Sequence, residues 1–234
     1  MRSKALAPIA ALFMMVSGVV TAAAEPTARP VDLPVNLPVN PRTSFAVVSV
    51  VPGVSTATPN ADEPRPALSI IKLYLVDFAL RHGDGSPGDK ALAQSAIQLS
   101  DNNAANALDN KYPQAIGATA GEFHLTHTWR AGFWGNSTTS ARDTASFLSA
   151  KEITDPGSPI LGWMATAAPV AADGTAQNWG TAHIPAMMGT KWGWADDRVS
   201  LVASASFGPG FATAAFTNGG PGDENADLAA FSLH

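Results

Sequence analysis

The sequence predicts an α+β fold, in which an antiparallel β-sheet is flanked by helices that include a reduced helical subdomain. Three observations support this prediction. The β-branched, apolar run Phe45–Val51 is typical of a buried strand, and Leu68–Leu80 is apolar almost all round, as a buried helix is. Three further strand-like runs fill the last third of the chain. Strands on both sides of a helical stretch favour helices packed on one antiparallel sheet.

Composition excludes several classes of protein. Of the 234 residues, 46% are hydrophobic and 14% charged, so the chain has enough apolar surface to fold. It has no cysteine, which excludes disulfides, thiolate metal sites and cysteine nucleophiles. Its net charge is −5 and it contains no run of lysine or arginine, so we expect neither nucleic acid nor an anionic membrane surface as a partner.

Residues 1–24 are predicted to be a signal peptide. Arg2 and Lys4 give a positive start, Ala5–Val20 is apolar, and Ala22–Ala24 offers small residues for signal-peptidase cleavage. The apolar stretch is shorter than the roughly 20 residues that span a bilayer. We therefore expect export, cleavage and a secreted or cell-envelope location without stable membrane insertion; an uncleaved N-terminal anchor is the alternative.

Residues 25–42 are predicted to form a proline-rich linker. This stretch contains the near repeat Leu33–Asn36 and Leu37–Asn40, and proline at such density prevents helices and central strands. The remaining residues, 43–234, are enough for a single domain with a substantial hydrophobic core.

The first elements of this domain are the strand Phe45–Val51 and the helix Leu68–Leu80. In the helix only Lys72 and Asp77 are charged, and the segment is too short to cross a membrane, which favours a helix inside a globular core. Four further helical patterns follow: Asp89–Leu99, Ala104–Leu108, Pro113–Phe123 and Ser140–Ala150. The hydroxyls of Thr138–Ser140 are suited to cap the last of these helices.

The last third of the chain predicts an antiparallel meander. Its strand-like runs are Ala186–Trp194, Val199–Phe207 and Phe211–Thr217. The short segments between them, one polar and one of glycine and proline, are typical of hairpin turns. A closing helix is expected at about Glu224–Leu233.

Lys72 and Ser69 are the first residues that suggest chemistry. A lysine inside an apolar helix loses hydration, which lowers its pKa toward that of a general base at neutral pH. Ser69 lies three residues earlier, on the same helix face and in the first turn, where free backbone N–H groups favour a developing oxyanion. The alternative is a capping serine beside a lysine that extends to solvent.

Two short motifs could complete such a site. Ser100–Asn102 separates two predicted helices, where it serves either as an N-cap and turn or as a loop that presents a hydroxyl and an amide to a substrate. In Lys191–Gly193 a strand lysine stands near a glycine, so a substrate backbone can approach closely while a cation holds an anion. An ordinary strand lysine is the alternative.

In this order the three motifs resemble the S-x-x-K, S-D-N and K-[ST]-G triplets of class A β-lactamases and penicillin-binding proteins. Ser95–Leu108 is similar to the region around S-D-N in class A enzymes, and Ser137–Ala145 resembles the helix start that follows their omega loop. Lys191–Asn218 resembles the last three strands of the family in length. The resemblance covers most of residues 43–233 and implies a β-lactamase/transpeptidase-like domain that needs no cofactor.

The resemblance implies catalytic roles for three side chains. Ser69 would be the acylated nucleophile and Lys72 its base, while Ser100 would relay a proton to the leaving group. The backbone N–H groups of Ser69 and Trp194 would form the oxyanion hole.

The resemblance also implies substrate-binding residues. Asn102 would hold the amide side chain of the substrate, and Lys191 would support its carboxylate end. Trp192, Gly193 and Trp194 continue the strand that the substrate would follow.

The sequence departs from the family pattern in two places. Trp192 stands where the family has a threonine or serine, so a hydroxyl that binds the substrate carboxylate is missing and a bulky ring would fill its pocket. The segment Arg130–Asn136, which corresponds to the omega loop, contains no acid to activate a deacylating water. Glu122 lies in the preceding helical pattern and does not match that motif.

These observations favour an exported serine hydrolase that forms an acyl-enzyme with an amide or ester in the cell envelope, without efficient β-lactam hydrolysis. Its substrate would be a small molecule or peptidoglycan-like. The alternative is a catalytically inactive envelope-binding module with the same fold, which Trp192 favours. A third hypothesis, a zinc hydrolase using His124, His127 and His183, lacks a surrounding carboxylate motif, so we expect no metal.

Overall fold

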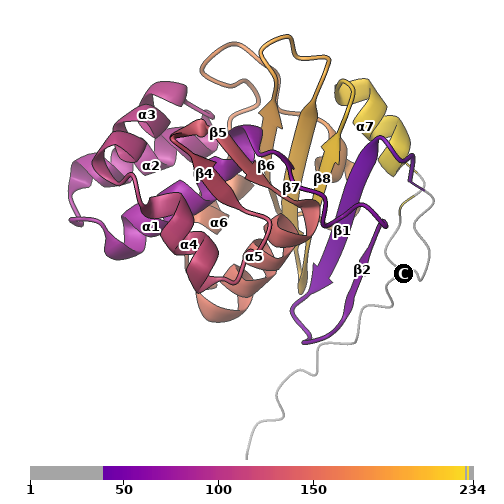
Figure 1. Cartoon of the computed structure of the whole chain (residues 1–234), viewed down its shortest axis with the longest axis horizontal. Coiled ribbons are helices and arrows are strands. Elements are labelled where there is room, and N and C mark those ends of the chain that lie inside the picture. The colour runs from indigo at the N-terminus through magenta and orange to yellow at the C-terminus, as the bar shows by residue number, and fades with distance from the viewer. Residues whose placement is uncertain (1–38, 230, 232–234) are drawn as a thin grey trace, which may run out of the picture.

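A five-stranded antiparallel sheet forms the centre of the computed structural model, which describes residues 39–229 and 231 (Figure 1). The strands are β1 (Thr43–Ser49), β2 (Ser55–Ala57), β6 (Gly189–Trp194), β7 (Val202–Gly208) and β8 (Phe211–Thr217). Their order is β2-β1-β8-β7-β6, so the first strand pairs with the last and β6 lies at an edge. The predicted signal peptide and most of the predicted linker lie outside the described residues.

A second, three-stranded sheet has the order β3-β5-β4. It consists of β3 (Arg65–Pro66), β4 (Trp129–Ala131) and β5 (Phe133–Thr139). Strands β4 and β5 form a hairpin around Gly132, whose φ of +75° lies in the left-handed region that glycine adopts without strain.

Helices cover both faces of the large sheet. They are α1 (Lys72–His82), α2 (Pro87–Gln98), α3 (Asn102–Lys111), α4 (Ala115–Glu122), α5 (Ala141–Thr154), α6 (Pro159–Ala165) and α7 (Pro221–Leu228), with 3₁₀ turns η1 (Leu68–Ile71) and η2 (Gly180–His183). Helix α5 packs on β1 and β8, while α7 lies beside η2. Helices α1–α4 gather at one side of the sheet and form the small helical subdomain (Figure 1). The predicted α+β fold is confirmed.

The boundaries of the helices follow local capping chemistry. Ser86 accepts a hydrogen bond from the N–H of Asp89 and precedes a proline at the first position of α2. Ser140 accepts from the N–H of Asp143 at the start of α5, as the predicted cap requires. Helix α1 is buried on nearly every side, which explains why its sequence lacks a polar face.

Several elements differ from the sequence prediction. The closing helix begins at Pro221 and ends at Leu228, earlier than predicted, since proline is well placed at the first position of a helix. Strand β6 begins at Gly189 rather than Ala186, whose positive φ of 69° interrupts an extended backbone. Strands β2 to β5, helix α6 and η2 were not predicted.

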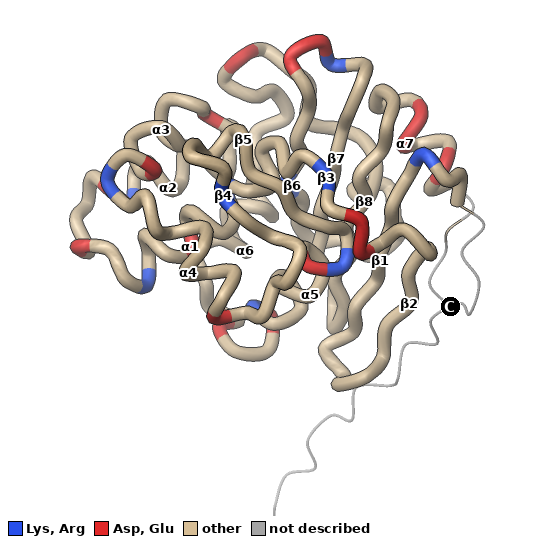
Figure 2. Tube along the Cα trace, viewed as in Figure 1, with Lys and Arg blue, Asp and Glu red and all other residues tan. Residues whose placement is uncertain are grey.

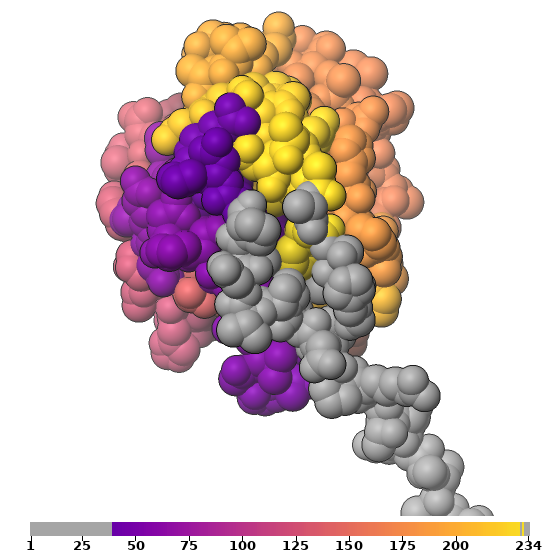
Figure 3. Space-filling view, turned by 90° about the vertical axis from the view of Figure 1, so that its right-hand side faces the viewer, coloured from indigo at the N-terminus to yellow at the C-terminus, as the bar shows by residue number. Residues whose placement is uncertain are grey.

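The start of the described chain is attached to its end. Arg42 donates to Asp227 at 2.8 Å and to Asp223 at 2.7 Å, so this residue of the predicted linker takes part in the fold. Figure 3 shows the first described residues next to the C-terminal segment on one face of the molecule. Within residues 39–229, no helix is both long and apolar enough to cross a membrane.

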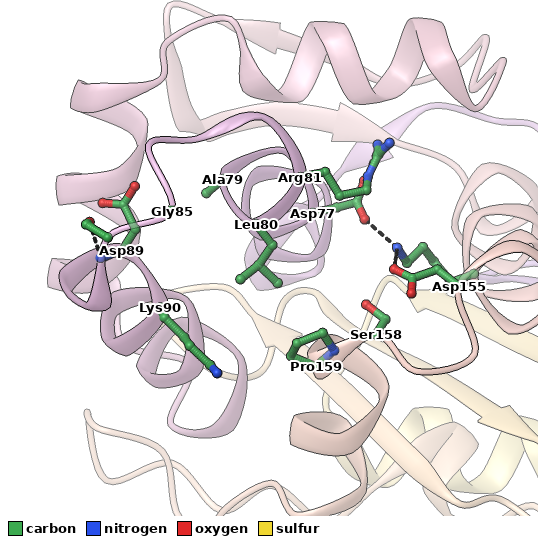
Figure 4. A pocket seen from close by; sticks show the side chains of 12 residues that line it. Asp77, Ala79, Leu80, Arg81, Gly85, Asp89, Lys90, Asp155, Ser158 and Pro159 are labelled. Carbon is green, nitrogen blue, oxygen red and sulfur yellow. Dashed lines mark hydrogen bonds and ion pairs between the residues drawn. The ribbon is translucent and has the colours of Figure 1, made fainter.

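A buried ion pair joins α1 to α5 beside a small pocket of about 280 Å³ (Figure 4). Nζ of Lys151 lies 2.8 Å from Oδ1 of Asp77 and 2.6 Å from Oδ2 of Asp155. Arg81 binds the other oxygen of Asp77 at 2.6 Å. Lys151 and Asp77 are both 1% exposed, so each buried charge is compensated only by its ion pairs, two for each residue.

Replacing Lys151 by methionine is expected to lower the free energy of unfolding by about 3 kcal/mol, because the Asp77 carboxylate stays buried with one cation fewer. The double variant Asp77→Asn/Lys151→Met should recover part of this loss, since it also removes the uncompensated charge. Urea denaturation measures both. A loss below about 0.5 kcal/mol, the size of a surface ion pair, would contradict this role.

Candidate active site

Ser69 and Lys72 lie side by side where η1 continues into α1. Nζ of Lys72 is 2.9 Å from Oγ of Ser69, and the spacing of three residues places both on one face of the helix. Lys72 is completely buried, whereas Ser69 is 8% exposed and lines a cleft. Leu68, just before the serine, has a positive φ of 53°, an uncommon conformation that is found at functional sites.

The environment of Lys72 suits a proton acceptor. Its Nζ also donates to the carbonyl of Ser100 at 2.6 Å and to Oδ1 of Asn102 at 2.7 Å. Burial lowers the pKa of Lys72 from 10.5 to about 7, against the opposing charges of Asp101 and Asp173. A large part of the lysine is therefore neutral at physiological pH, with a lone pair next to the Ser69 hydroxyl.

Ser100 connects this pair to a second lysine. Its Oγ lies 2.7 Å from Nζ of Lys191 and 3.4 Å from Nζ of Lys72. Its φ of 52° is also positive. The conformation is held by Asp101, which caps α3 and accepts the hydroxyl of Ser95 at 2.9 Å. The hydroxyl of Ser100 is thus placed to pass a proton between two amines.

Lys191 is completely buried on β6. Its Nζ donates to Ser100 and, at 3.1 Å, to the carbonyl of Trp192. Burial, reinforced by the nearby charge of Lys72, lowers the pKa of Lys191 well below 10.5. The amine of Lys191 therefore contacts Ser100 and does not line the cleft.

Gly193 allows β6 to approach the serine closely. A Cβ atom at this position would lie 2.8 Å from Cβ of Leu68 and 2.9 Å from the backbone nitrogen of Ser69. Any side chain would push the strand away from η1. The close packing of β6 against η1 therefore requires a glycine at position 193.

The backbone of Trp194 faces the same space. In the β6–β7 ladder Ala195 donates its N–H to the carbonyl of Leu201. Because N–H directions alternate along a strand, the N–H of Trp194 points away from β7, across the free edge of β6. The backbone nitrogen of Ser69 lies against Gly193, the strand residue before Trp194. The two N–H groups that the resemblance implied for an oxyanion hole therefore belong to neighbouring segments.

The cleft has a volume of about 620 Å³ and reaches from α3 to the β6–β7 turn. Ser69 and Asn102 lie on its helical side. The indole of Trp134 and the ring of Trp194 form two of its walls. Ser69, Lys72, Ser100 and Lys191 come together beside this cleft, at the distances given above.

The ring of Trp192 lies outside the substrate pocket that the sequence predicted it would fill. Its Nε1 donates to the carbonyl of Trp179 at 2.9 Å, and its ring packs on Trp179 and Val202 in a separate cluster. It is 7% exposed and does not line the cleft. The ring therefore does not fill the substrate pocket, although the position still supplies no hydroxyl.

The β4–β5 hairpin takes the place where the resemblance implied an omega loop. Arg130 binds both carboxylate oxygens of Asp109 at 2.8 Å, and Nε1 of Trp134 donates to Oδ1 of Asn106 at 2.7 Å. These bonds tie the hairpin to α3. Its cleft-facing part, residues 133–136, contributes aromatic and amide groups and no carboxylate.

Sequence reasoning missed three charged residues of the cleft, Asp173, Asp196 and Arg198. Asp173 lies in the long connection between α6 and η2, and Arg198 in the β6–β7 turn. The Asp-Gly pair at Asp173 is a turn signal, but no local pattern places that turn beside Trp194.

The histidines do not form a metal centre. His183 contacts Asn178 at 2.9 Å, and His127 lies 3.8 Å from Asp143. Over the described residues, 39–229 and 231, no group of three or more His, Asp or Glu side chains is placed to bind a metal.

Comparison with known proteins finds similarity to this chain in structure and not in sequence. No protein-family model matches the chain, and no curated protein matches it in sequence. Solved structures do match. Penicillin-binding protein D2 from Listeria monocytogenes, in its cefotaxime-bound form, has a TM-score of 0.59 at 18% identity over 83% of this chain and 95% of its own.

Two other similar structures come from enzymes. A carbapenemase from Vibrio cholerae has a TM-score of 0.58 at 18% identity over 79% of this chain and 88% of its own. The D-alanyl-D-alanine carboxypeptidase of Mycobacterium tuberculosis has a TM-score of 0.58 at 18% identity, over 86% of this chain and 92% of its own. The chain therefore has the β-lactamase and penicillin-binding-protein fold, as the sequence motifs predicted.

Proposed function

We propose that the protein is an exported serine hydrolase that forms an acyl-enzyme on Ser69 with an amide or ester of the cell envelope. One observation carries the proposal: a buried lysine with a pKa of about 7 lies 2.9 Å from a serine hydroxyl that borders an open cleft. The similar structures of a carboxypeptidase and a carbapenemase support it.

Acylation would proceed in two proton-coupled steps. Neutral Lys72 takes the proton of Ser69 as Oγ attacks the carbonyl carbon. The resulting oxyanion accepts hydrogen bonds from the backbone N–H groups of Ser69 and Trp194. The bond to the leaving group then breaks while Ser100 donates its hydroxyl proton to the leaving nitrogen or oxygen. Lys72 or Lys191 restores that proton, since both lie within 3.4 Å of Ser100.

The alternative hypothesis, an inactive envelope-binding module, was favoured by Trp192, and the position of this ring does not support it. That alternative required the ring of Trp192 to occupy the substrate pocket, whereas the ring packs on Trp179. The catalytic distances and the open cleft favour an enzyme.

The proposal is tested by incubating the protein with a fluorophosphonate, which phosphonylates activated serines, and measuring intact mass. We expect one adduct per chain, absent in Ser69→Ala. Complete absence of labelling in a folded wild-type protein, verified by circular dichroism, would favour the inactive module.

The rate of acylation is expected to rise with pH around a midpoint of about 7, because the proton acceptor is the neutral form of Lys72. Two pH units below the midpoint only about 1% of the lysine is neutral, so the rate should be about a hundredfold below its plateau. Single-turnover acylation by an uncharged aryl ester from pH 5 to 9 measures this. A flat profile, after correction for the ester's own hydrolysis, would exclude Lys72 as the base.

Export rests on the predicted signal peptide at residues 1–24. Expression of the full chain in a bacterial host, followed by N-terminal sequencing of the extracytoplasmic protein, tests it. We expect mature protein beginning after Ala24; full-length protein in the membrane fraction would instead support the uncleaved anchor.

A further inference from the structure

The charged side chains at the end of the cleft near β6 carry a net negative charge. The lining contains Asp173, Asp196 and Arg198. In Figure 2 the loop between α6 and η2 and the β6–β7 turn, which carry these charges, project side by side beyond the strands. This is the end at which the resemblance implied a pocket for a substrate carboxylate.

Arg198 is already paired with the loop that carries Asp173. Its Nε donates to Oγ1 of Thr175 at 2.7 Å, and its Nη2 donates to the backbone carbonyl of Asp173 at 3.3 Å. The same nitrogen lies 3.7 Å from the Asp173 carboxylate. The guanidinium therefore bridges two loop residues, and its positive charge is compensated there.

Asp173 is held as an anion at the rim of the cleft. Its Oδ2 accepts from Nε1 of Trp194 at 3.0 Å, and its Oδ1 accepts from the N–H of Thr175 at 2.9 Å. Partial burial raises the pKa of Asp173, but these hydrogen bonds and Arg198 outweigh it and hold the pKa below 3.8. The carboxylate is thus bonded to Trp194, the residue whose backbone N–H we assign to the oxyanion hole.

The two lysines of the site do not present a cation to a ligand at this end of the cleft. Lys191 is completely buried, and its Nζ is engaged by Ser100 and the carbonyl of Trp192. Lys72 is also completely buried, beneath Ser69 and Asn102. A carboxylate at this end of the cleft would meet two carboxylates, Asp173 and Asp196, against a single guanidinium that already pairs with Asp173. It would also lack the hydroxyl that Trp192 replaces.

We infer that the cleft selects acyl donors whose leaving group carries a positive charge, and that it discriminates against donors whose leaving group carries a carboxylate. This inference rests on the proposed acyl transfer and narrows its substrate class. An ammonium group near Trp194 would lie close to the Asp173 carboxylate, whereas a carboxylate there would be repelled in a partly desolvated site.

Three phenylacetate esters test the inference. Their phenol leaving groups carry, in the meta position, a trimethylammonium, a carboxamide or a carboxylate group. Each acylation rate is measured by intact mass and divided by the rate of hydroxide hydrolysis of the same ester. We expect the order ammonium, carboxamide, carboxylate, with at least a tenfold ratio between first and last that decreases as salt is added.

Asp173→Asn should reduce this ratio severalfold, because the amide oxygen can still accept from Trp194 while the charge is lost. Asp62→Asn makes an equal change in net charge at a half-buried residue that pairs with Arg142 and does not line the cleft, so it should leave the ratio unchanged. Equal rates for the three esters, or fastest acylation by the carboxylate, would overturn the inference and leave the proposed acyl transfer intact. No adduct with any ester would instead refute the proposed function.

Discussion

Lys72→Met is expected to lower the rate of Ser69 acylation by about a thousandfold, within the range that a positioned general base contributes. Methionine has a similar length and suits the apolar core around α1, so the fold should survive. The loss would come from removing the lone pair that now lies 2.9 Å from the serine hydroxyl. Single-turnover labelling by the uncharged aryl ester measures the rate.

The matched control is Lys90→Met, which removes an exposed lysine of α2. This variant should be acylated at the wild-type rate. Thermal denaturation must show that Lys72→Met remains folded at the assay temperature. Equal labelling of folded Lys72→Met and wild type would contradict the assignment of Lys72 as the base.

The acyl-enzyme is expected to persist once it forms. Deacylation requires a base that activates water, and the hairpin segment Arg130–Asn136 contributes none. Asp173, an acid of the cleft lining, has a lowered pKa and is held by Trp194, so it is a weak base. Product release should therefore show one stoichiometric burst, followed by a rate at least about a hundredfold lower.

β-Lactams provide the sharpest form of this prediction. Their carboxylate would face Asp173 without the family's hydroxyl, so acylation by penicillins should be slow as well as unproductive. Losing a hydrogen bond to a charged group costs about 1.5–3 kcal/mol, roughly ten- to a hundredfold in affinity. Stopped-flow measurement with a chromogenic cephalosporin gives the rate. Rapid multiple turnover by the wild-type protein would show that another group supplies the base.

Much of the fold could be predicted from the sequence because its signals are local. The strand Phe211–Thr217 has the predicted bounds, and the buried helix was evident from its apolar residues. The β4–β5 hairpin was missed because Phe133–Thr139 lacks the apolar–polar alternation of a half-buried strand. Its position depends on one ion pair and one side-chain hydrogen bond to α3, which no local pattern reveals.

The candidate site was likewise predictable only in part. Each motif taken alone left an ordinary structural alternative open. The resemblance to a known family, carried by the order of the three motifs, implied that Ser69, Lys72, Ser100 and Lys191 share one site. Alternation along β6 would have indicated the direction of Trp192: since Lys191 faces Ser100, the next side chain must face the other side of the sheet. Asp173 could not be found, because its proximity to Trp194 depends on the path of a long loop.

The central claim, that Ser69 is acylated with Lys72 as its base, is tested most directly by locating the adduct. The protein is incubated with the trimethylammonium ester at pH 5 and pH 8, digested, and analysed by tandem mass spectrometry. We expect a phenylacetyl group on Ser69 alone, formed much faster at pH 8 after correction for the ester's intrinsic reactivity. An adduct on another residue, or a pH-independent rate at Ser69, would contradict the account.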